Sequence, residues 1–232
     1  MAVNSELYKK MTAELKQKNV TLIAVSKTKS PEEILELYNL GQRDFGENYV
    51  QELKEKYEQL PKDIRWHFIG HLQSNKVKLI APFVFLIHSV DSLRLLKEIN
   101  KEAKKNNRVI DCLLQVYIAK EETKFGLNEE ELKAIIEAIS RTDSEIEGSF
   151  KNICIKGLMG MASFTDDEET VRNEFKILKS ISDKYSLLIT HHSPFTIMSM
   201  GMSADYKTAI EEGSNMVRIG SLLFGKRISN QK

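Results

Sequence analysis

Short apolar runs alternate with amphipathic helical patterns along the whole chain. Several of these runs are apolar on both faces, which is typical of parallel strands that are covered by helices. The pattern predicts one further helix at residues 3–17, before the first strand. The predicted strands begin near residues 21, 43, 65, 83, 111, 153, 195 and 216.

Helix starts lie between the predicted strands and have recognisable capping chemistry. Ser30 is followed by Pro31 and, at the third helical position, Glu33, which is the pattern of a capping box with proline at the first position. The segments 128–131 and 165–168 repeat this logic, with Asn128 and Thr165 as the caps. A stripe of apolar residues follows Ser92 and consists of Leu95, Leu96, Ile99 and Ala103.

Eight βα units in 232 residues predict a closed (β/α)8 barrel, an α/β fold with an extra N-terminal helix. A doubly wound open sheet is the alternative, but eight units in this length favour closure. We find no linker rich in proline or glycine, so residues 1–232 are expected to form a single domain. The segment 184–195 is the least defined, because it fits either a short strand or a helix that runs into a loop.

The composition argues against several classes of partner. Lys and Arg total 34 and Asp and Glu total 33, so the net charge of +1 indicates no nucleic acid and no anionic membrane as partner. No apolar run is long enough to span a bilayer, and the N-terminus lacks a signal-peptide core, so we expect a cytoplasmic protein. Cys112 and Cys154 are expected to be buried free thiols. The five histidines show no metal-binding spacing, so no metal site is expected.

The candidate chemistry gathers where the predicted strands end. The C-terminal ends of barrel strands and the loops after them form the active face, and Lys27 ends the first strand. Serine and glycine follow strands seven and eight, at 199–203 and at 220–221, where barrels often bind phosphate through backbone N–H groups. A lysine that faces a phosphate site predicts a Schiff base with a phosphorylated carbonyl compound, either pyridoxal phosphate or a sugar phosphate.

Arg218 separates these two ligands. It lies in the last predicted strand, two residues before Gly220, and an arginine is one known partner of the pyridine nitrogen of pyridoxal phosphate. A permanently cationic partner accepts no proton, so it keeps the ring nitrogen largely unprotonated and the ring a weak electron sink. The alternative is a structural arginine that pairs with Glu211 or Glu212.

Several motifs in this order resemble the YggS/PROSC family of pyridoxal phosphate homeostasis proteins. They are AVSKT, FGENYVQE, HFIGHLQSNK, the KFG at 124, GLMGM, SMGMSAD and VRIGSLLFG. This family is itself similar to the barrel domain of alanine racemase, the third fold type of pyridoxal phosphate enzymes. One departure is Ala162-Ser163, where the family pattern often has a proline.

The resemblance implies a set of cofactor-binding residues. Lys27 would form the Schiff base with pyridoxal 5'-phosphate, Arg218 would contact the pyridine nitrogen, and Asn48 would line the pocket. His71 or Met159 would lie near the ring. The phosphate would be held by Ser199, Gly201, Gly220 and Ser221.

The resemblance also implies what the protein does with the cofactor. It would buffer pyridoxal phosphate or deliver it, with PLP-dependent apo-enzymes as partners, and would keep amino-acid and keto-acid pools balanced. No strong catalytic activity is implied, and we expect a monomer.

Two enzymatic readings remain as alternatives. A racemase of the alanine racemase type needs a second base opposite the lysine. Tyr49 and Tyr117 are candidates near the barrel mouth, but no motif supports either. The chain ends at Lys232, which leaves no room for the second domain of that enzyme, so efficient racemisation is not expected. A Schiff-base aldolase acting on a phosphosugar would also use Lys27, but it gives Arg218 no role.

Overall fold

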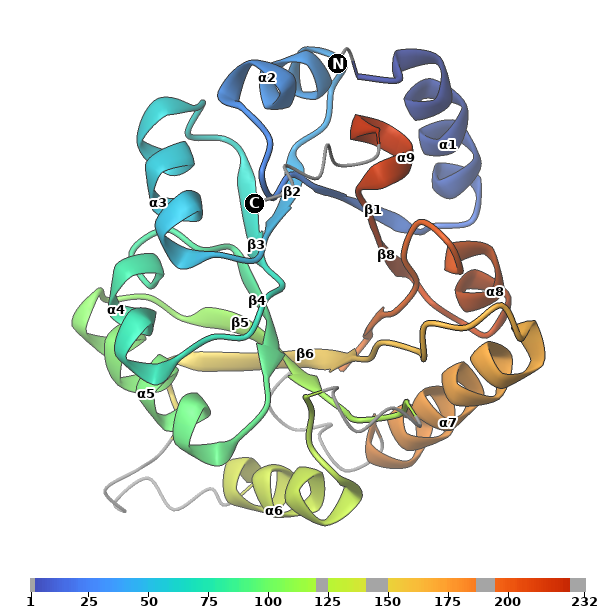
Figure 1. Ribbon diagram of the computed structural model, residues 1–232. Helices are drawn as coiled ribbons and strands as arrows, with labels where there is room; N and C mark the ends of the chain where they lie inside the picture. The colour runs from blue at the N-terminus through green and yellow to red at the C-terminus, as the bar shows by residue number, and fades with distance from the viewer. Residues whose placement is uncertain (1–2, 120–124, 141–149, 187–194, 226–232) are drawn as a thin grey trace, which may run out of the picture.

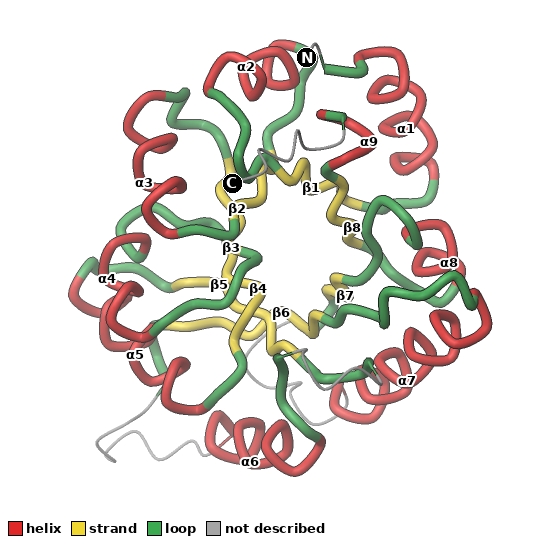
Figure 2. The backbone as a smooth tube through the Cα atoms, in the orientation of Figure 1, coloured by secondary structure: helices red, strands yellow, loops and turns green. Residues whose placement is uncertain are grey.

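The computed structural model of the protein describes residues 3–119, 125–140, 150–186 and 195–225. Within these residues, eight parallel strands close into a barrel in which the strand order follows the sequence. Figures 1 and 2 show the ring of strands enclosed by a ring of helices. The strands are β1 (Thr21–Val25), β2 (Asp44–Glu47), β3 (Arg65–Phe68), β4 (Leu86–Val90), β5 (Ile110–Gln115), β6 (Ile153–Met159), β7 (Ile197–Ser199) and β8 (Met216–Ile219).

Closure of the sheet confirms the (β/α)8 barrel and excludes the open sheet. Strand β8 pairs in parallel with β1, and Ile23 lies opposite Arg218 in that register. The predicted N-terminal helix is α1, and its entry is joined to α9 by a hydrogen bond from the Asn4 N–H to the Leu223 carbonyl at 2.9 Å. The helices are α1 (Ser5–Gln17), α2 (Pro31–Asn39), α3 (Val50–Gln59), the 3-10 turn η1 (Ser74–Lys76), α4 (Val77–Ile80), α5 (Leu93–Lys105), α6 (Glu129–Ser140), α7 (Glu168–Ser186), α8 (Tyr206–Glu211) and α9 (Ser221–Phe224).

Two of the three caps read from the sequence begin their helices as predicted. Ser30 accepts a hydrogen bond from the N–H of Glu33 and forms a complete capping box with it, and Asn128 does the same before α6. Helix α7 begins two residues later than a cap at Thr165 predicts. Its first turn is capped by Asp167, whose Oδ1 accepts from the N–H of Glu169 at 3.1 Å. Because an aspartate caps as well as a threonine, the acidic run left this boundary open.

The apolar residues divide between two layers. The outer layer lies between strands and helices and includes the largest fully buried side chains, among them Trp66, Phe45, Phe68, Phe175 and Phe224. The predicted stripe on α5 is buried in this layer. The inner layer fills the barrel itself with Ile23, Leu86, Leu113, Met159 and Met216. This inner plug fills the barrel beneath its mouth and leaves the loops after the strands as the place for a ligand site.

Three further expectations have a structural outcome. Cys112 is buried and Cys154 is half-buried, and both are free thiols. Of the segment 184–195, residues 187–194 lie outside the described residues, and α7 extends to Ser186. Within the described ranges, no helix combines the length and the apolar character that crossing a bilayer requires.

Candidate functional site

Lys27 lies two residues beyond the end of β1, at the barrel mouth. Side chains alternate along a strand, so Val25 and Lys27 continue the face of Ile23, which points into the barrel. Thr28 then adopts a left-handed conformation with φ 65°, which turns the chain toward α2. Lys27 is half-buried and lines a cavity of about 950 Å³, which we call the rim cavity.

A buried ionic group lies beside the turn that carries Lys27. We call it the lysine-side cluster and define it as Ser26, Glu47, Glu52 and Lys56. The ammonium of Lys56 donates to the Ser26 carbonyl, to Glu47 Oε1 and to Glu52 Oε1, each at 2.7 Å. The hydroxyl of Ser26 donates to Glu47 Oε1 at 2.6 Å. Both the backbone and the side chain of the residue before Lys27 are therefore held by charged groups.

Glu47 is the most perturbed acid of this cluster. Burial raises its pKa to about 7, against the opposing influence of Lys56 and Ser26. Its second oxygen, Oε2, is buried without a hydrogen-bond partner among the described residues. A carboxyl group at the end of β2 thus has a pKa near neutral pH and contacts Ser26, the residue before Lys27.

Asn48 lines the rim cavity directly after Glu47, as expected. Its Oδ1 is buried and lacks a hydrogen-bond partner among the described residues. Gly70 packs against the Asn48 backbone so closely that a Cβ there would lie 2.3 Å from the Asn48 carbonyl oxygen. A buried polar atom without a partner at a cavity wall indicates a ligand with a matching polar group.

The two serine–glycine turns after β7 and β8 lie side by side. The N–H of Gly220 donates to the Ser203 hydroxyl at 3.3 Å, and Gly220, Ser221 and Ser203 all line the rim cavity. Gly201 has φ 95°, and a Cβ there would lie 2.6 Å from the Cβ of Ala209, so only glycine fits at this bend. The predicted anion-binding turns therefore meet at one wall of the same cavity as Lys27.

Arg218 is buried in the barrel and lines the floor of the rim cavity. Its Nη1 donates to the Ser199 carbonyl at 2.8 Å and to the Ser199 hydroxyl at 2.7 Å, and its Nη2 donates to the Gly160 carbonyl at 3.0 Å. Burial lowers its pKa to about 10, and Asp205 acts in the opposite direction. The guanidinium is thus a buried cation that is fixed by neutral acceptors.

The alternative that Arg218 pairs with Glu211 or Glu212 is wrong. Both carboxylates instead bind Arg172 of α7, at 2.8 Å and 2.7 Å. Arg218 points inward from β8, whereas the two glutamates lie at the end of α8, outside the barrel.

Four of the residues assigned by resemblance do not line the cavity. Ser199 is still part of β7 and is buried beneath the cavity between His88 and Arg218. Met159 belongs to the inner plug, and Gly201 is buried at the bend after β7. His71 is exposed, binds Asp91 at 3.0 Å and stacks on Phe125. In this geometry the Ser199 hydroxyl contacts Arg218, and its expected contact with a phosphate stays a prediction.

The cavity also has lining residues that the sequence did not assign to the cofactor individually. Met161 continues the inward alternation of Met159 to the mouth, and Ser203 ends the predicted turn 199–203. Phe224 lines the cavity from α9. The alternation could have identified Met161. The choice of Ser203 over Ser199 needed the position at which β7 ends.

Ser163 belongs to the pair Ala162-Ser163, which stands where the family pattern often has a proline. Its N–H donates to Glu174 Oε2 at 2.6 Å and its hydroxyl donates to Glu174 Oε1 at 2.7 Å. A proline lacks the N–H, so it could not make the first of these bonds. In this chain the loop after β6 is therefore tied to α7 by a buried carboxylate.

The rim cavity fits pyridoxal phosphate in the kinds of group it offers. It has a primary amine for an aldehyde at Lys27, a backbone N–H and hydroxyls for a phosphate at Gly220, Ser221 and Ser203, and a cation for the ring nitrogen at Arg218. The unpartnered amide oxygen of Asn48 adds an acceptor at the wall.

Comparison with known proteins defines the class first. Residues 5–228 match the family of alanine racemase N-terminal domains. Among solved structures, an alanine racemase of Clostridium difficile 630 shares the fold, with a TM-score of 0.71 and 17% identity over 94% of this chain and 56% of that chain. The chain is therefore a barrel of the alanine racemase N-terminal type.

The particular family follows from closer relatives. A pyridoxal phosphate homeostasis protein of Aquifex aeolicus is 44% identical over 89% of this chain and 86% of its own length, and the one of Homo sapiens is 39% identical over 91% and 78%. The chain belongs to the family of pyridoxal phosphate homeostasis proteins. PipY of Synechococcus elongatus, solved with PLP bound, has a TM-score of 0.81 and 33% identity over 92% of this chain and 98% of PipY.

Proposed function

We propose that this protein binds pyridoxal 5'-phosphate in the rim cavity, attached covalently to Lys27, and serves in intracellular PLP homeostasis. The observation that carries the proposal is that Lys27, Arg218 and the Gly220–Ser221 turn line one cavity. When bound, the cofactor supplies an aldehyde that condenses with amines and a ring that withdraws electrons. Relatives named for PLP homeostasis and the PLP-bound structure of PipY support the assignment.

Each wall of the cavity has a distinct part in this binding. Lys27 holds the aldehyde carbon, the backbone N–H of Gly220 with the hydroxyls of Ser203 and Ser221 holds the phosphate, and Arg218 faces the ring nitrogen. Asn48 accepts a hydrogen bond from the ligand through Oδ1. Because Arg218 carries its protons in its resting state, the ring nitrogen receives none from it, which suits a carrier better than a strong catalyst.

We further propose that the protein buffers or delivers PLP as a monomer and has no strong catalytic activity. Racemisation needs a second base opposite Lys27, and neither Tyr49 nor Tyr117 is among the residues that line the cavity. Incubation of the PLP-loaded protein with L-alanine should leave the optical rotation unchanged over hours. Rapid loss of rotation would instead favour the racemase alternative.

Reduction with borohydride and peptide sequencing by mass spectrometry test the attachment. The wild-type protein should carry one reduced pyridoxyl group on Lys27, and Lys27→Ala should carry none while keeping its circular dichroism spectrum. Lys29 is the matched control, because it lines the same cavity but is held by Glu33 at 3.1 Å and by the Phe224 carbonyl at 3.0 Å. Lys29→Ala should retain the label on Lys27. A label on any other lysine would contradict the proposal.

The visible spectrum tests the cofactor against a sugar phosphate. Purified protein loaded with PLP should absorb in the visible region, whereas a phosphosugar bound to the same lysine gives no colour. Size-exclusion chromatography with light scattering should give the mass of one chain, 26.6 kDa. Transfer to an apo-enzyme is tested by mixing the loaded protein with an inactive PLP-dependent apo-enzyme and following the recovery of its activity.

A further inference from the structure

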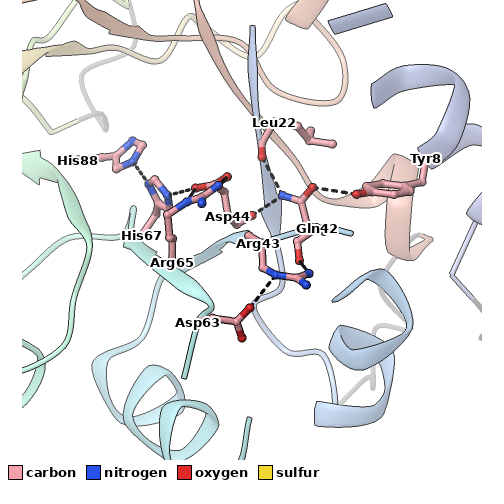
Figure 3. Close-up of polar contacts among 9 residues, drawn as sticks. All are labelled: Tyr8, Leu22, Gln42, Arg43, Asp44, Asp63, Arg65, His67 and His88. Atoms are coloured by element: carbon pink, nitrogen blue, oxygen red, sulfur yellow. Dashed lines mark hydrogen bonds and ion pairs between the residues drawn. The ribbon is translucent and has the colours of Figure 1, made fainter. Parts of the chain in front are cut away.

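A continuous line of hydrogen bonds crosses the barrel interior and ends at Arg218. Asp44 Oδ1 contacts His67 Nε2, His67 Nδ1 contacts His88 Nε2, and His88 Nδ1 contacts the Ser199 hydroxyl, each at 3.0 Å. The Ser199 hydroxyl then contacts Arg218 Nη1 at 2.7 Å. Figure 3 shows the first part of this line, from Asp44 through His67 to His88. We call the four residues Asp44, His67, His88 and Ser199 the arginine-side network.

The line runs from the surface to the rim cavity. The side chain of Arg65, which donates to both oxygens of Asp44, is 45% exposed, and that of Asp44 is 12% exposed. His67, His88 and Ser199 are almost entirely buried. Arg218 at the other end lines the cavity. Polar groups at this depth are costly unless each is hydrogen-bonded, so their arrangement has to be self-consistent.

The direction of every bond follows from its first member. Burial opposes the ionisation of Asp44, but hydrogen bonds from Arg65 and His67 outweigh it and lower the pKa of Asp44. An ionised carboxylate only accepts, so His67 carries its proton on Nε2. Burial lowers the pKa of both His67 and His88, so both rings are neutral and each has one N–H. His67 Nδ1 must then accept from His88 Nε2, and His88 Nδ1 must accept from the Ser199 hydroxyl.

This direction determines how Ser199 meets Arg218. The hydroxyl proton of Ser199 is committed to His88, so only the lone pairs of its oxygen face the guanidinium. Nη1 is held by the hydroxyl and the carbonyl of Ser199, and Nη2 is held by the Gly160 carbonyl. The third guanidinium nitrogen, Nε, has no hydrogen-bond partner among the described residues. It is the donor left for a ligand.

We propose that Asp44, His67 and His88 are positioning residues for Arg218. They set the polarity of a hydrogen-bond chain that fixes both imidazoles as Nε2–H tautomers and turns Ser199 into an acceptor toward Arg218. The proposal gives Ser199 a role other than binding the phosphate. Its cofactor part rests on the proposed PLP function, whereas the tautomers are a property of the protein without ligand.

Nitrogen NMR of the ligand-free protein tests the direction of the hydrogen bonds in the arginine-side network. The protonated and bare nitrogens of a neutral imidazole differ strongly in ¹⁵N chemical shift, and five histidines are few enough to assign by single substitutions. His67 and His88 should both appear as neutral Nε2–H tautomers at pH 7. A protonated ring or an Nδ1–H tautomer at either position would overturn the proposal.

Asp44→Asn is the decisive variant, because an amide can donate to His67 Nε2 and allow the opposite tautomers. It should change the tautomer populations of both rings and raise the Kd for PLP about fivefold, the loss expected from one neutral hydrogen bond. Asp63→Asn is the matched control. Asp63 pairs with Arg43 at 2.8 Å near the same end of the barrel but is not part of the arginine-side network, as Figure 3 shows. It should change neither the tautomers nor the Kd.

His88→Gln serves if Asp44→Asn does not fold. Its amide can replace Nε2 toward His67 but cannot also reach Ser199, so the Kd for PLP should again rise about fivefold and the visible absorption maximum should move. Unchanged PLP affinity and spectrum in either folded variant would overturn the coupling to Arg218. Failure of the wild-type protein to bind PLP would instead contradict the proposed function, while the NMR result would still decide the tautomers.

Discussion

Two groups of buried polar residues lie beside the rim cavity, and they hold different parts of the protein by different kinds of contact. The lysine-side cluster uses full charges and holds a backbone turn, because Lys56 and Glu47 bind Ser26 and Glu52 accepts from the Thr28 N–H. The arginine-side network acts through its two neutral histidines and the Ser199 hydroxyl, and it holds the side chain of Arg218. Both flank one cavity, so the comparison shows two ways to pre-orient a cationic residue in a protein interior.

The difference has an electrostatic reason. A buried cation beside Lys27 would repel an ammonium there, so the cluster contains two carboxylates to offset the single charge of Lys56. Arg218 has no carboxylate in contact among the described residues. The acid of the arginine-side network, Asp44, is four hydrogen bonds away from it. Its charge therefore remains available to a ligand in the cavity.

Removing the charge of Lys56 should give the largest effect. Lys56→Met leaves Glu47 buried without its cation, which should lower the free energy of unfolding by about 3–5 kcal/mol at pH 8. Urea denaturation measures this. The loss should be smaller at pH 5, where Glu47 binds a proton and needs no partner. Lys54→Met on the same helix, which breaks only a surface pair with Glu58 at 3.6 Å, should cost under about 1 kcal/mol. Equal losses of unfolding free energy in both variants would mean that Lys56 stabilises the buried charge of Glu47 no more than a surface ion pair does.

The pH dependence of Glu47 should give the next effect. Its pKa is about 7 in the folded protein and 4.5 as an ordinary glutamate, so the folded state binds an extra proton between these values. Stability should therefore fall as the pH rises from about 4.5 to about 7, by up to about 3 kcal/mol, and then level off.

Glu47→Gln isolates this dependence, because it removes the titrating group and keeps a similar shape. The stability of the wild type relative to Glu47→Gln should decline across the same pH range in urea titrations. A difference that stays constant with pH would show that Glu47 titrates near its ordinary value. The histidines of the arginine-side network should add nothing to this change near pH 7, because burial lowers the pKa of both below the ordinary value.

Removing a hydrogen bond next to the outer end of the arginine-side network should give the smallest effect. Tyr8 of α1 donates to Gln42 Oε1 at 3.2 Å, and Gln42 in turn donates to the carbonyls of Leu22 and Asp44 (Figure 3). Tyr8→Phe should lower the free energy of unfolding by about 1 kcal/mol and leave PLP binding unchanged. Tyr38→Phe, which removes a bond to Asp63 near the surface, should cost less. A large loss of PLP affinity in Tyr8→Phe would show that α1 is coupled to the cavity.

Much of the fold could be predicted because its signals are local. Alternating runs, the Ser30 capping box and the inward phase of Ile23, Val25 and Lys27 all arise from residues that are neighbours in sequence. The order of eight units then left closure as the compact solution. The start of α7 was misplaced because Thr165 and Asp167 are equally good caps, and only packing selects between them.

The candidate site was predictable at its ends and not at its centre. Lys27, Gly220 and Ser221 follow strand ends, and Arg218 lies near the end of β8. A barrel brings all strand ends to one rim. Ser199 and Ser203 flank the same glycine, and the sequence does not say which one leaves the strand. His67, His88 and Ser199 are separated by 21 and 111 residues, so no local pattern joins them.

The sequence by itself determined the barrel, its family and the amine on which the proposed chemistry rests, because strand periodicity and short motifs act over a few residues. Only the tertiary structure decided which groups share the barrel interior and in which direction their hydrogen bonds run. Burial is the physical reason: a proton position becomes fixed only when water is excluded and each donor has a single acceptor within reach.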